Sequence, residues 1–241
     1  YAFMRDVPSG IGSPRSPAAA LGQLAHRVLE SAVSCGWLVE PEWEERLEAV
    51  WQETCEEEAR ERWQQTAESW PGYELKRALL RYVASGIREL IVGLPSDALI
   101  LTEPLLTSAD NLLEGKPDLL IRSEDVVQIV DYKTGRVVEE QSGAPLDPYA
   151  RQLKLYSYLE YQTSARWPDS AHLFPFDRDP VEVPIKPSEC DELAAEAMAT
   201  ALEYNGLVPK SPPSRCSPDT CRFCSFASMC PDFWDLCDES W

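Results

Sequence analysis

Apolar residues recur every three or four positions in the first part of the chain, and this spacing predicts amphipathic helices. The helical spacing covers residues 18–35, 41–70 and 73–92. Gly36 and the Pro71-Gly72 pair separate these segments, because both residue types end helices readily. Residues 1–17 are rich in Pro, Gly and Ser, so we expect an extended lead-in before the first helix.

After residue 97 the apolar residues fall into short runs separated by turn residues, a pattern that predicts strands. The expected strands are residues 98–107, 117–122, 126–132, 171–176 and 181–185. The first three follow one another closely and suit a meander. Two further helices are expected over residues 149–162 and 188–204. Ser188 is the expected N-cap of the second helix, and Asn205-Gly206 is its expected stop.

The order of these elements predicts one compact domain of the α/β class, with a mixed central sheet and helices on its faces. Within it we expect an N-terminal helical region over residues 1–97, a core over residues 98–208 and a Pro- and Cys-rich module over residues 209–241. No run approaches the roughly 18 uninterrupted apolar residues of a membrane span, and no signal peptide is visible. We therefore expect a cytoplasmic protein without a membrane partner.

The charge balance is strongly acidic, with 22 basic and 41 acidic residues among 241, for a formal net charge of -19. This balance argues against a protein that coats polyanions, although a local basic groove could still hold a nucleic acid. Much of the excess lies between Glu40 and Glu61, which contain ten Glu and only two Arg. We interpret this segment as a solvated helix face; the alternative is a docking surface for a basic partner.

The richest candidate chemistry lies at the ends of two neighbouring predicted strands. Asp118 begins one strand, and Asp131 and Lys133 end the next. Residues two apart in a strand face the same side, and a hairpin would bring Asp118 close to them. Two carboxylates suit a hard cation such as Mg²⁺ or Mn²⁺, with the Tyr132 carbonyl as a further ligand. Such a metal polarises a scissile phosphate and lowers the pKa of a bound water, which Lys133 could orient.

A surface ion pair of Asp131 and Lys133, worth at most about 1 kcal/mol, is the alternative explanation of these residues. The buried-type run Ile129-Val130 leads directly into the charges, which favours a site. Glu103, on the preceding strand, is expected to be a structural strand position; the alternative is an outer group of the metal site.

The motif of Pro117-Asp118, twelve further residues and Asp131-Tyr132-Lys133 resembles the PD-(D/E)XK nuclease superfamily. Three more segments resemble the RecB-type exonuclease branch of that superfamily. They are the helix segment Gly22-Gln-Leu-Ala-His26-Arg-Val-Leu-Glu30, the Gly115-Lys-Pro-Asp118 motif and the Gln152-Leu-Lys-Leu-Tyr156 motif. The whole resemblance extends over about residues 20 to 230.

The resemblance implies a restriction-endonuclease-like fold and metal-dependent hydrolysis of DNA, as an exonuclease acting on single-stranded ends. It implies that His26, Asp118 and Asp131 bind the metal and that Lys133 assists the water. An imidazole ligand favours activity with Mn²⁺ as well as Mg²⁺. The family works in DNA repair and recombination or in CRISPR adaptation, beside a helicase or an integrase partner. A non-catalytic module of the same fold, binding DNA ends or a protein within such a complex, is the alternative.

The Gln-x-x-x-Tyr motif places Gln152 and Tyr156 on one face of a helix, because residues four apart are neighbours there. By the resemblance, Gln152 positions the attacking water or a phosphate oxygen, and Tyr156 contacts the nucleic-acid strand. Arg151 and Lys154 on the same helix are candidates for phosphate contacts.

Four cysteines near the C-terminus, in the pattern Cys216-x4-Cys221-x2-Cys224-x5-Cys230, predict a structural metal site. The spacing suits zinc or an iron–sulfur cluster. AddB-like and CRISPR-associated relatives carry Cys-x2-Cys-x5-Cys at this place and hold a [4Fe–4S] cluster with it. Their fourth ligand precedes the histidine motif, where this chain has no cysteine. Cys216 is therefore the expected fourth ligand, with Cys35 as the alternative and Zn²⁺ still open.

Overall fold

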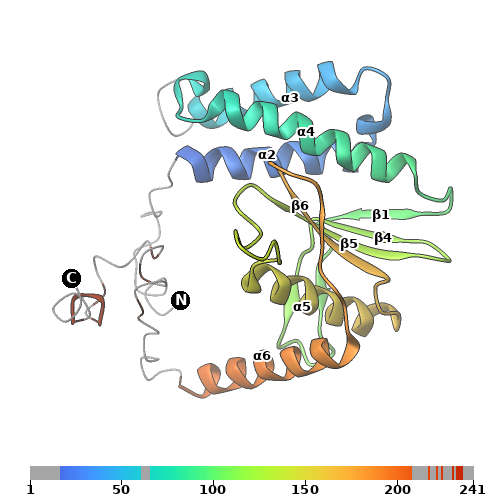
Figure 1. Cartoon of the computed structure of the whole chain (residues 1–241), viewed down its shortest axis with the longest axis vertical. Helices are drawn as coiled ribbons and strands as arrows, with labels where there is room; N and C mark the ends of the chain where they lie inside the picture. The colour runs from blue at the N-terminus through green and yellow to red at the C-terminus, as the bar shows by residue number, and fades with distance from the viewer. Residues whose placement is uncertain are drawn as a thin grey trace. The chain divides into compact units, whose positions relative to one another are not determined.

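The structure of the chain, a computed structural model, describes residues 17–60, 66–207, 217, 221, 224, 230 and 232–235. Two units are distinguished, namely Pro17–Ala199 and a second unit made of Tyr1–Ser16 and Thr200–Trp241. The larger unit contains the sheet and the helices that cover it (Figure 1).

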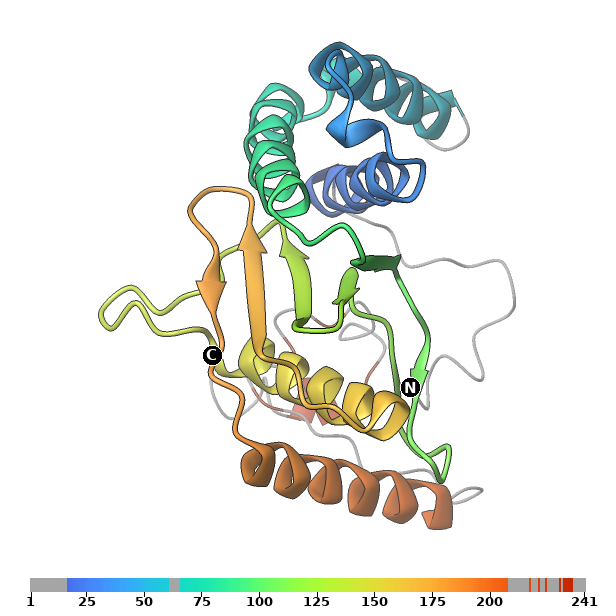
Figure 2. The ribbon, with the colours of Figure 1, turned by 90° about the vertical axis from the view of Figure 1, so that its right-hand side faces the viewer.

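Helices from the N-terminal part of the chain form a layer on one face of the sheet (Figures 1 and 2). They are α2 (Pro17–Ser34), α3 (Trp43–Glu58) and α4 (Tyr73–Val92), joined by the 3-10 turns η1 (Trp37–Val39) and η3 (Ala67–Ser69). Their buried faces share one apolar cluster with Leu119, Val130 and Tyr132 of the sheet. The helices expected over residues 18–35 and 73–92 are confirmed. Of the expected lead-in over residues 1–17, only Pro17 is described, and it begins α2.

The single helix expected over residues 41–70 is wrong. Helix α3 ends at Glu58, Thr66 has extended backbone, and Ala67–Ser69 forms a separate 3-10 turn. This turn buries Ala67 and Trp70 in the same apolar cluster as α3. Burial of Ala67 and Trp70 therefore overrides the helical spacing at this end of the segment.

The central sheet has the order β1-β4-β5-β6-β7. Its strands are β1 (Leu99–Thr102), β4 (Leu119–Arg122), β5 (Val127–Lys133), β6 (Ser170–Pro175) and β7 (Val181–Glu182). Strands β5 and β6 pair in parallel, and the other pairs are antiparallel. The expected meander is confirmed for β1, β4 and β5. The strand expected over residues 181–185 is too long: β7 ends at Glu182, shortly before Pro184, which lacks an N–H for pairing.

The single strand expected over residues 98–107 is also wrong. Strand β1 ends at Thr102, and Glu103 has a left-handed φ of 44°. Pro104 follows and has no N–H to donate, so the ladder is interrupted there. The chain then forms β2 (Leu106–Thr107), which pairs with β3 (Glu114–Gly115) in a separate two-stranded sheet.

Helix α5 (Asp147–Ser164) covers the second face of the sheet, so the molecule is a mixed α/β protein with helices on both faces (Figure 2). Its buried Leu153 and Leu159 share an apolar cluster with Leu120 and Ile129 of the sheet. Helix α6 (Pro187–Leu207) begins with a proline, which suits the first helical position because no N–H is needed there. Ser188 therefore lies inside α6 instead of capping it, and the helix runs past the expected end at residue 204.

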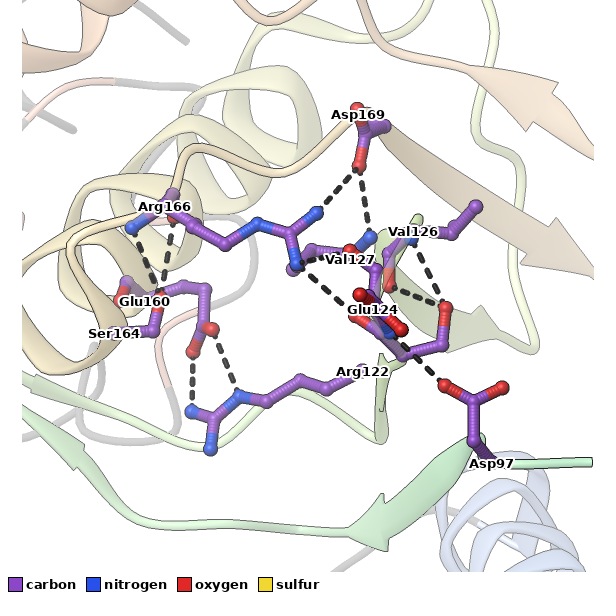
Figure 3. A network of polar contacts seen from close by, with 10 residues as sticks. Asp97, Arg122, Glu124, Val126, Val127, Glu160, Ser164, Arg166 and Asp169 are labelled. Atoms are coloured by element: carbon purple, nitrogen blue, oxygen red, sulfur yellow. Dashed lines mark hydrogen bonds and ion pairs between the residues drawn. The ribbon is translucent and has the colours of Figure 1, made fainter. Parts of the chain in front are cut away.

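The turn between β4 and β5 is anchored to α5 by a buried ion pair (Figure 3). Arg122, the last residue of β4, donates two hydrogen bonds of 2.8 and 2.7 Å to the two carboxylate oxygens of Glu160. The Glu160 side chain is fully buried, whereas that of Arg122 is 28% exposed. The two parallel bonds fix the orientation of both groups.

A second set of contacts holds the same turn from the segment after α5 (Figure 3). Arg166 Nη1 donates to the carbonyls of Ser123 and Glu124, at 3.0 and 2.9 Å. The Asp169 carboxylate accepts the N–H of Val127 at 2.8 Å. Because a one-residue slip would move every side chain to the other face, these anchors help to keep the β4–β5 register.

Candidate active site

The register of the β4–β5 hairpin brings two carboxylates together. Leu119 pairs with Val130, so Asp118 and Asp131 are the next opposed residues along the ladder. The Asp118 Oδ2 atom accepts the backbone N–H of Tyr132. The Asp118 carbonyl accepts the N–H of Glu103 at 3.1 Å. Both the side chain and the main chain of Asp118 are therefore held by the neighbouring strands.

Asp131 is almost fully buried, with 3% of its surface exposed, and forms an ion pair with Lys133 through Oδ2. Burial and the charge of Asp118 raise the pKa of Asp131 to about 6, while Lys133 acts in the opposite direction. Asp131, Lys133 and the buried Ile129 share one face of β5, the face covered by α5. The expected neighbourhood of the three charged residues is thus present in the structure.

Helix α5 adds two polar side chains to this face. Lys133 Nζ donates to Gln152 Oε1 at 2.9 Å, and Gln152 Nε2 donates to the Tyr156 hydroxyl at 2.8 Å. Lys133 Nζ also lies 5.1 Å from the centre of the Tyr149 ring. Burial raises the pKa of Tyr156 to about 12, so its hydroxyl keeps its proton at neutral pH. A continuous series of polar contacts therefore joins Asp131 to Tyr156.

His26 reaches the site from α2, on the other side of the sheet. Its Nδ1 atom lies 3.4 Å from Asp118 Oδ1. The imidazole stacks on Phe176, with centroids 6.3 Å apart and an interplanar angle of 11°, and meets the Tyr132 ring edge-on at 5.8 Å. Two aromatic rings thus support the imidazole beside the Asp118 carboxylate.

Glycines at the start of two motifs allow close packing around these residues. A Cβ at Gly22 of α2 would lie 2.8 Å from Thr134 Oγ1, directly after Lys133. A Cβ at Gly115 would lie 2.7 Å from the ring of Tyr156. Contacts this short are not found for real Cβ atoms, so both positions need glycine unless a neighbour moves.

The structure adds residues that the sequence analysis did not assign to the site. Lys76 of α4 contacts Thr134 and the Phe176 ring, and Phe176, just after β6, stacks on His26. Burial and the charge of Glu103 raise the pKa of Glu30, and Asp118 contributes in the same direction. Glu103 is not the expected strand position, because it lies just after β1 and has left-handed backbone. Phe176 is the end of a predicted strand, but no pattern in the sequence pairs it with His26.

The two basic residues expected to contact phosphates are bound to α6 instead. Arg151 pairs with Glu196 at 2.9 Å, and Lys154 pairs with Glu189 at 2.6 Å. These ion pairs connect the exposed side of α5 to α6. Their positive charge is balanced within the protein, which leaves less of it for a nucleic acid.

The donor set of the site suits a hard divalent cation. Among the described residues no three His, Cys, Asp or Glu side chains are grouped as a metal site. Asp118 Oδ2 accepts the Tyr132 N–H, and Asp131 Oδ2 contacts the Lys133 ammonium. This Asp131 oxygen is buried, so a cation bound there would share it with the lysine. Carboxylates and one imidazole are suitable ligands for Mg²⁺ and Mn²⁺.

The cysteine module is described only in part, since Cys216 lies outside the described residues. Cys221 and Cys230 are buried, and Cys224 is exposed. The Cys224 N–H donates to the Cys221 carbonyl at 3.1 Å, so the main chains of these two cysteines lie close together. Cys35, the alternative ligand, is an exposed thiol just after α2. Metal binding by these cysteines, the identity of the metal and its fourth ligand stay predictions.

A mixed sheet covered by helices, with two aspartates and a lysine at adjoining strand ends, makes this an α/β protein with a candidate metal site. The family model of the PD-(D/E)XK nuclease superfamily matches residues 3–231, and the chain belongs to this superfamily. No curated protein matches the chain.

One solved structure similar to the chain is titled "Crystal structure of SSO0001". It shares 13% sequence identity over 95% of this chain and 92% of that chain, with a TM-score of 0.35. None of the described helices combines the length and apolarity needed to cross a membrane.

Proposed function

We propose that the protein is a metal-dependent DNA nuclease of the RecB-type branch, acting as an exonuclease on single-stranded ends. The observation that carries this proposal is the set of contacts joining Asp118, Asp131, Lys133 and Gln152 at one end of the sheet. These residues come from two strands and a helix that are separate in sequence. A surface ion pair would not require that convergence or the burial of Asp131.

In this proposal His26, Asp118 and Asp131 hold the divalent cation, with the Tyr132 carbonyl as a further ligand. When bound, the cation supplies Lewis acidity toward the scissile phosphate and the attacking water. The buried position of Asp131 keeps bulk water away from one carboxylate oxygen, and the stacked Phe176 ring restricts the orientation of His26.

Lys133 would orient the attacking water and neutralise charge that develops on the phosphate. Its ammonium is held between Asp131 and Gln152, so its position is set before substrate binds. Gln152 would contact the water or a phosphate oxygen, because its amide lies between Lys133 and Tyr156. Tyr156, protonated at neutral pH, would donate its hydroxyl hydrogen to the nucleic-acid strand.

The preference for single-stranded ends is supported by charge. The chain carries a formal net charge of -19, and the basic side chains of Arg151 and Lys154 are paired with glutamates. Long duplex contacts need many unpaired cations, whereas a single strand can pass through a small site. We place the activity in DNA repair and recombination or in CRISPR adaptation, beside a helicase or integrase partner.

We also propose that the cysteine module binds a [4Fe–4S] cluster through Cys216, Cys221, Cys224 and Cys230. The support is the Cys spacing and the main-chain hydrogen bond between Cys224 and Cys221. A bound zinc ion is the alternative, and the visible spectrum separates the two, because the cluster is brown and zinc is colourless.

The nuclease proposal is tested with Asp131→Asn and Lys133→Ala variants and with single-stranded DNA labelled at either end. Both variants should lose cleavage by at least about a hundredfold with Mn²⁺ or Mg²⁺ and keep the far-UV circular dichroism spectrum of the folded wild type. Lys186→Ala, an exposed lysine on the segment before α6, is the control and should cleave normally. Wild-type protein that binds DNA ends without cutting them would support the non-catalytic module instead.

Covalently closed single-stranded circles test the exonuclease part of the proposal. An exonuclease should leave the circles intact and degrade the same sequence once it is linear. Cleavage of circles and linear strands at equal rates would contradict the requirement for an end while leaving the nuclease site itself supported.

A further inference from the structure

Lys76, on the first turns of α4, sends its ammonium group toward the end of β5. Its Nζ atom donates a hydrogen bond of 3.2 Å to the Thr134 carbonyl. The same atom lies 5.4 Å from the centre of the Phe176 ring, within reach of a cation–π attraction. The residue is half-buried, so both contacts are partly shielded from water.

Both partners of Lys76 are directly joined to the candidate active site. Thr134 follows Lys133, and its hydroxyl lies against Gly22 of α2, where a Cβ would come within 2.8 Å. The Phe176 N–H donates to the Lys133 carbonyl at 3.0 Å, and the Phe176 ring stacks on His26. The main chain after Lys133 and the imidazole of His26 therefore share one support.

The energetics argue against a purely structural reason for this lysine. Lys76 forms no ion pair with a carboxylate in the described part of the chain, and burial lowers its pKa despite an opposing effect of Asp177. Withdrawing an unpaired ammonium from water costs free energy that an apolar side chain of similar length would avoid. Groups that are kept charged at such a cost concentrate at functional sites.

We propose that Lys76 is a positioning residue of the active site. It fixes the backbone that follows Lys133 and, through the Phe176 ring, the orientation of His26. This inference rests on the proposed nuclease function for its kinetic consequence, but the positioning itself is a property of the metal-free protein. Lys76 acts through these neighbours and does not contact the DNA.

The direct test compares the histidine ring signals of Lys76→Met and wild-type protein by ¹⁵N NMR without added metal. The chain has only two histidines, so His172 on β6 is an internal reference. The ring nitrogen signals of His26 should move while those of His172 stay in place. Arg81→Met, an exposed change on the same helix, is the matched control and should move neither set.

The kinetic test uses the same variants on single-stranded DNA. A small displacement of catalytic groups is enough to slow a reaction, so kcat of Lys76→Met should fall about tenfold or more with KM unchanged. The melting temperature should change little, because the variant loses two weak contacts together with a half-buried ammonium that has no carboxylate partner among the described residues. Lys76→Arg, which keeps both the donor and the cation, should recover most of kcat and the wild-type His26 signals.

Two results would overturn the proposal. The first is an unchanged His26 spectrum in Lys76→Met. The second is a raised KM for DNA with normal kcat, together with a salt dependence of DNA binding that is smaller by about one phosphate contact. That result would identify Lys76 as a DNA ligand. If Lys76→Met does not fold, Lys76→Gln replaces it in both tests. If the wild type cuts no DNA, the nuclease proposal fails and the NMR comparison still decides the positioning.

Discussion

Gly115 and Tyr156 lie so close that a Cβ on Gly115 would stand 2.7 Å from Cε1 of the tyrosine ring. The Gly-x-x-Asp segment and the Gln-x-x-x-Tyr helix are therefore packed directly on each other. The Tyr156 hydroxyl accepts a hydrogen bond from Gln152, which in turn accepts one from Lys133. A change at Gly115 should thus reach Lys133, the proposed catalytic lysine, through two hydrogen bonds.

Gly115→Ala should displace the Tyr156 ring and lower both stability and cleavage. Overpacking of a closely packed contact costs typically about 1–3 kcal/mol, and Leu159, whose Cδ1 would lie 3.1 Å from the new Cβ, limits the room for adjustment. Urea unfolding measures the loss, and steady-state kinetics measure the fall in kcat. Gly206→Ala on α6 is the control, because no described atom lies within 4 Å of its Cβ. Equal effects of the two substitutions would show that the Tyr156 contact is unimportant.

Because the pKa of Asp131 is raised, we expect a rise in pH to lower the stability of the metal-free protein and to increase its stabilisation by a bound metal. Burial and Asp118 raise this pKa to about 6, above the value of about 3.9 expected in the unfolded chain. The folded, metal-free protein therefore holds the proton more tightly, and this contribution to stability is lost as pH rises from about 4 to about 6. A bound cation competes with that proton, so stabilisation by Mn²⁺ should increase over the same rise in pH.

Thermal unfolding as a function of pH, with and without Mn²⁺, measures both trends. Asp131→Asn removes the titrating group, so the two pH dependences should flatten together. Mn²⁺ stabilisation that is independent of pH in the wild type would mean that Asp131 is not a ligand.

The Arg122–Glu160 pair should be needed for stability but not for the chemistry. Glu160 is fully buried, so removing Arg122 leaves an unpaired carboxylate, and Arg122→Met should destabilise the protein by about 3–5 kcal/mol. The pair lies at the far end of β4 from Asp118, so kcat of the folded variant should stay near wild type. Urea unfolding checks the first statement. The double variant Arg122→Met with Glu160→Leu should recover much of the loss; no recovery would show that the cost has another source.

Removal of the metal from the cysteine module should reduce stability, because thiolate coordination supplies folding free energy to a short segment. Cys221→Ser and Cys224→Ser should lower the melting temperature and abolish the visible absorbance of a cluster. Cys237→Ser should do neither. Comparison of Cys216→Ser with Cys35→Ser identifies the fourth ligand: loss of metal only in the Cys35 variant would contradict the set chosen here.

Some elements could be predicted from the sequence because their signals are local. The apolar spacing of α2 and α4 repeats over several turns, so their bounds agree closely with residues 18–35 and 73–92. The apolar run before Asp131 predicts β5 and places Asp131 and Lys133 at the end of this strand. Other boundaries depend on distant contacts: α3 stops early because Ala67 and Trp70 are buried.

The chemical groups of the candidate site and their order are readable along the chain: an imidazole, two carboxylates, a lysine and the Gln–Tyr pair. Their spatial arrangement comes from the fold, in which His26 lies on one helical layer, Gln152 lies on the other, and Lys76 and Phe176 lie beside them. Helical and strand periodicity is set by neighbouring residues. Contacts such as Gly115 with Tyr156 depend on strand register and layer packing, which bring together residues far apart in the chain.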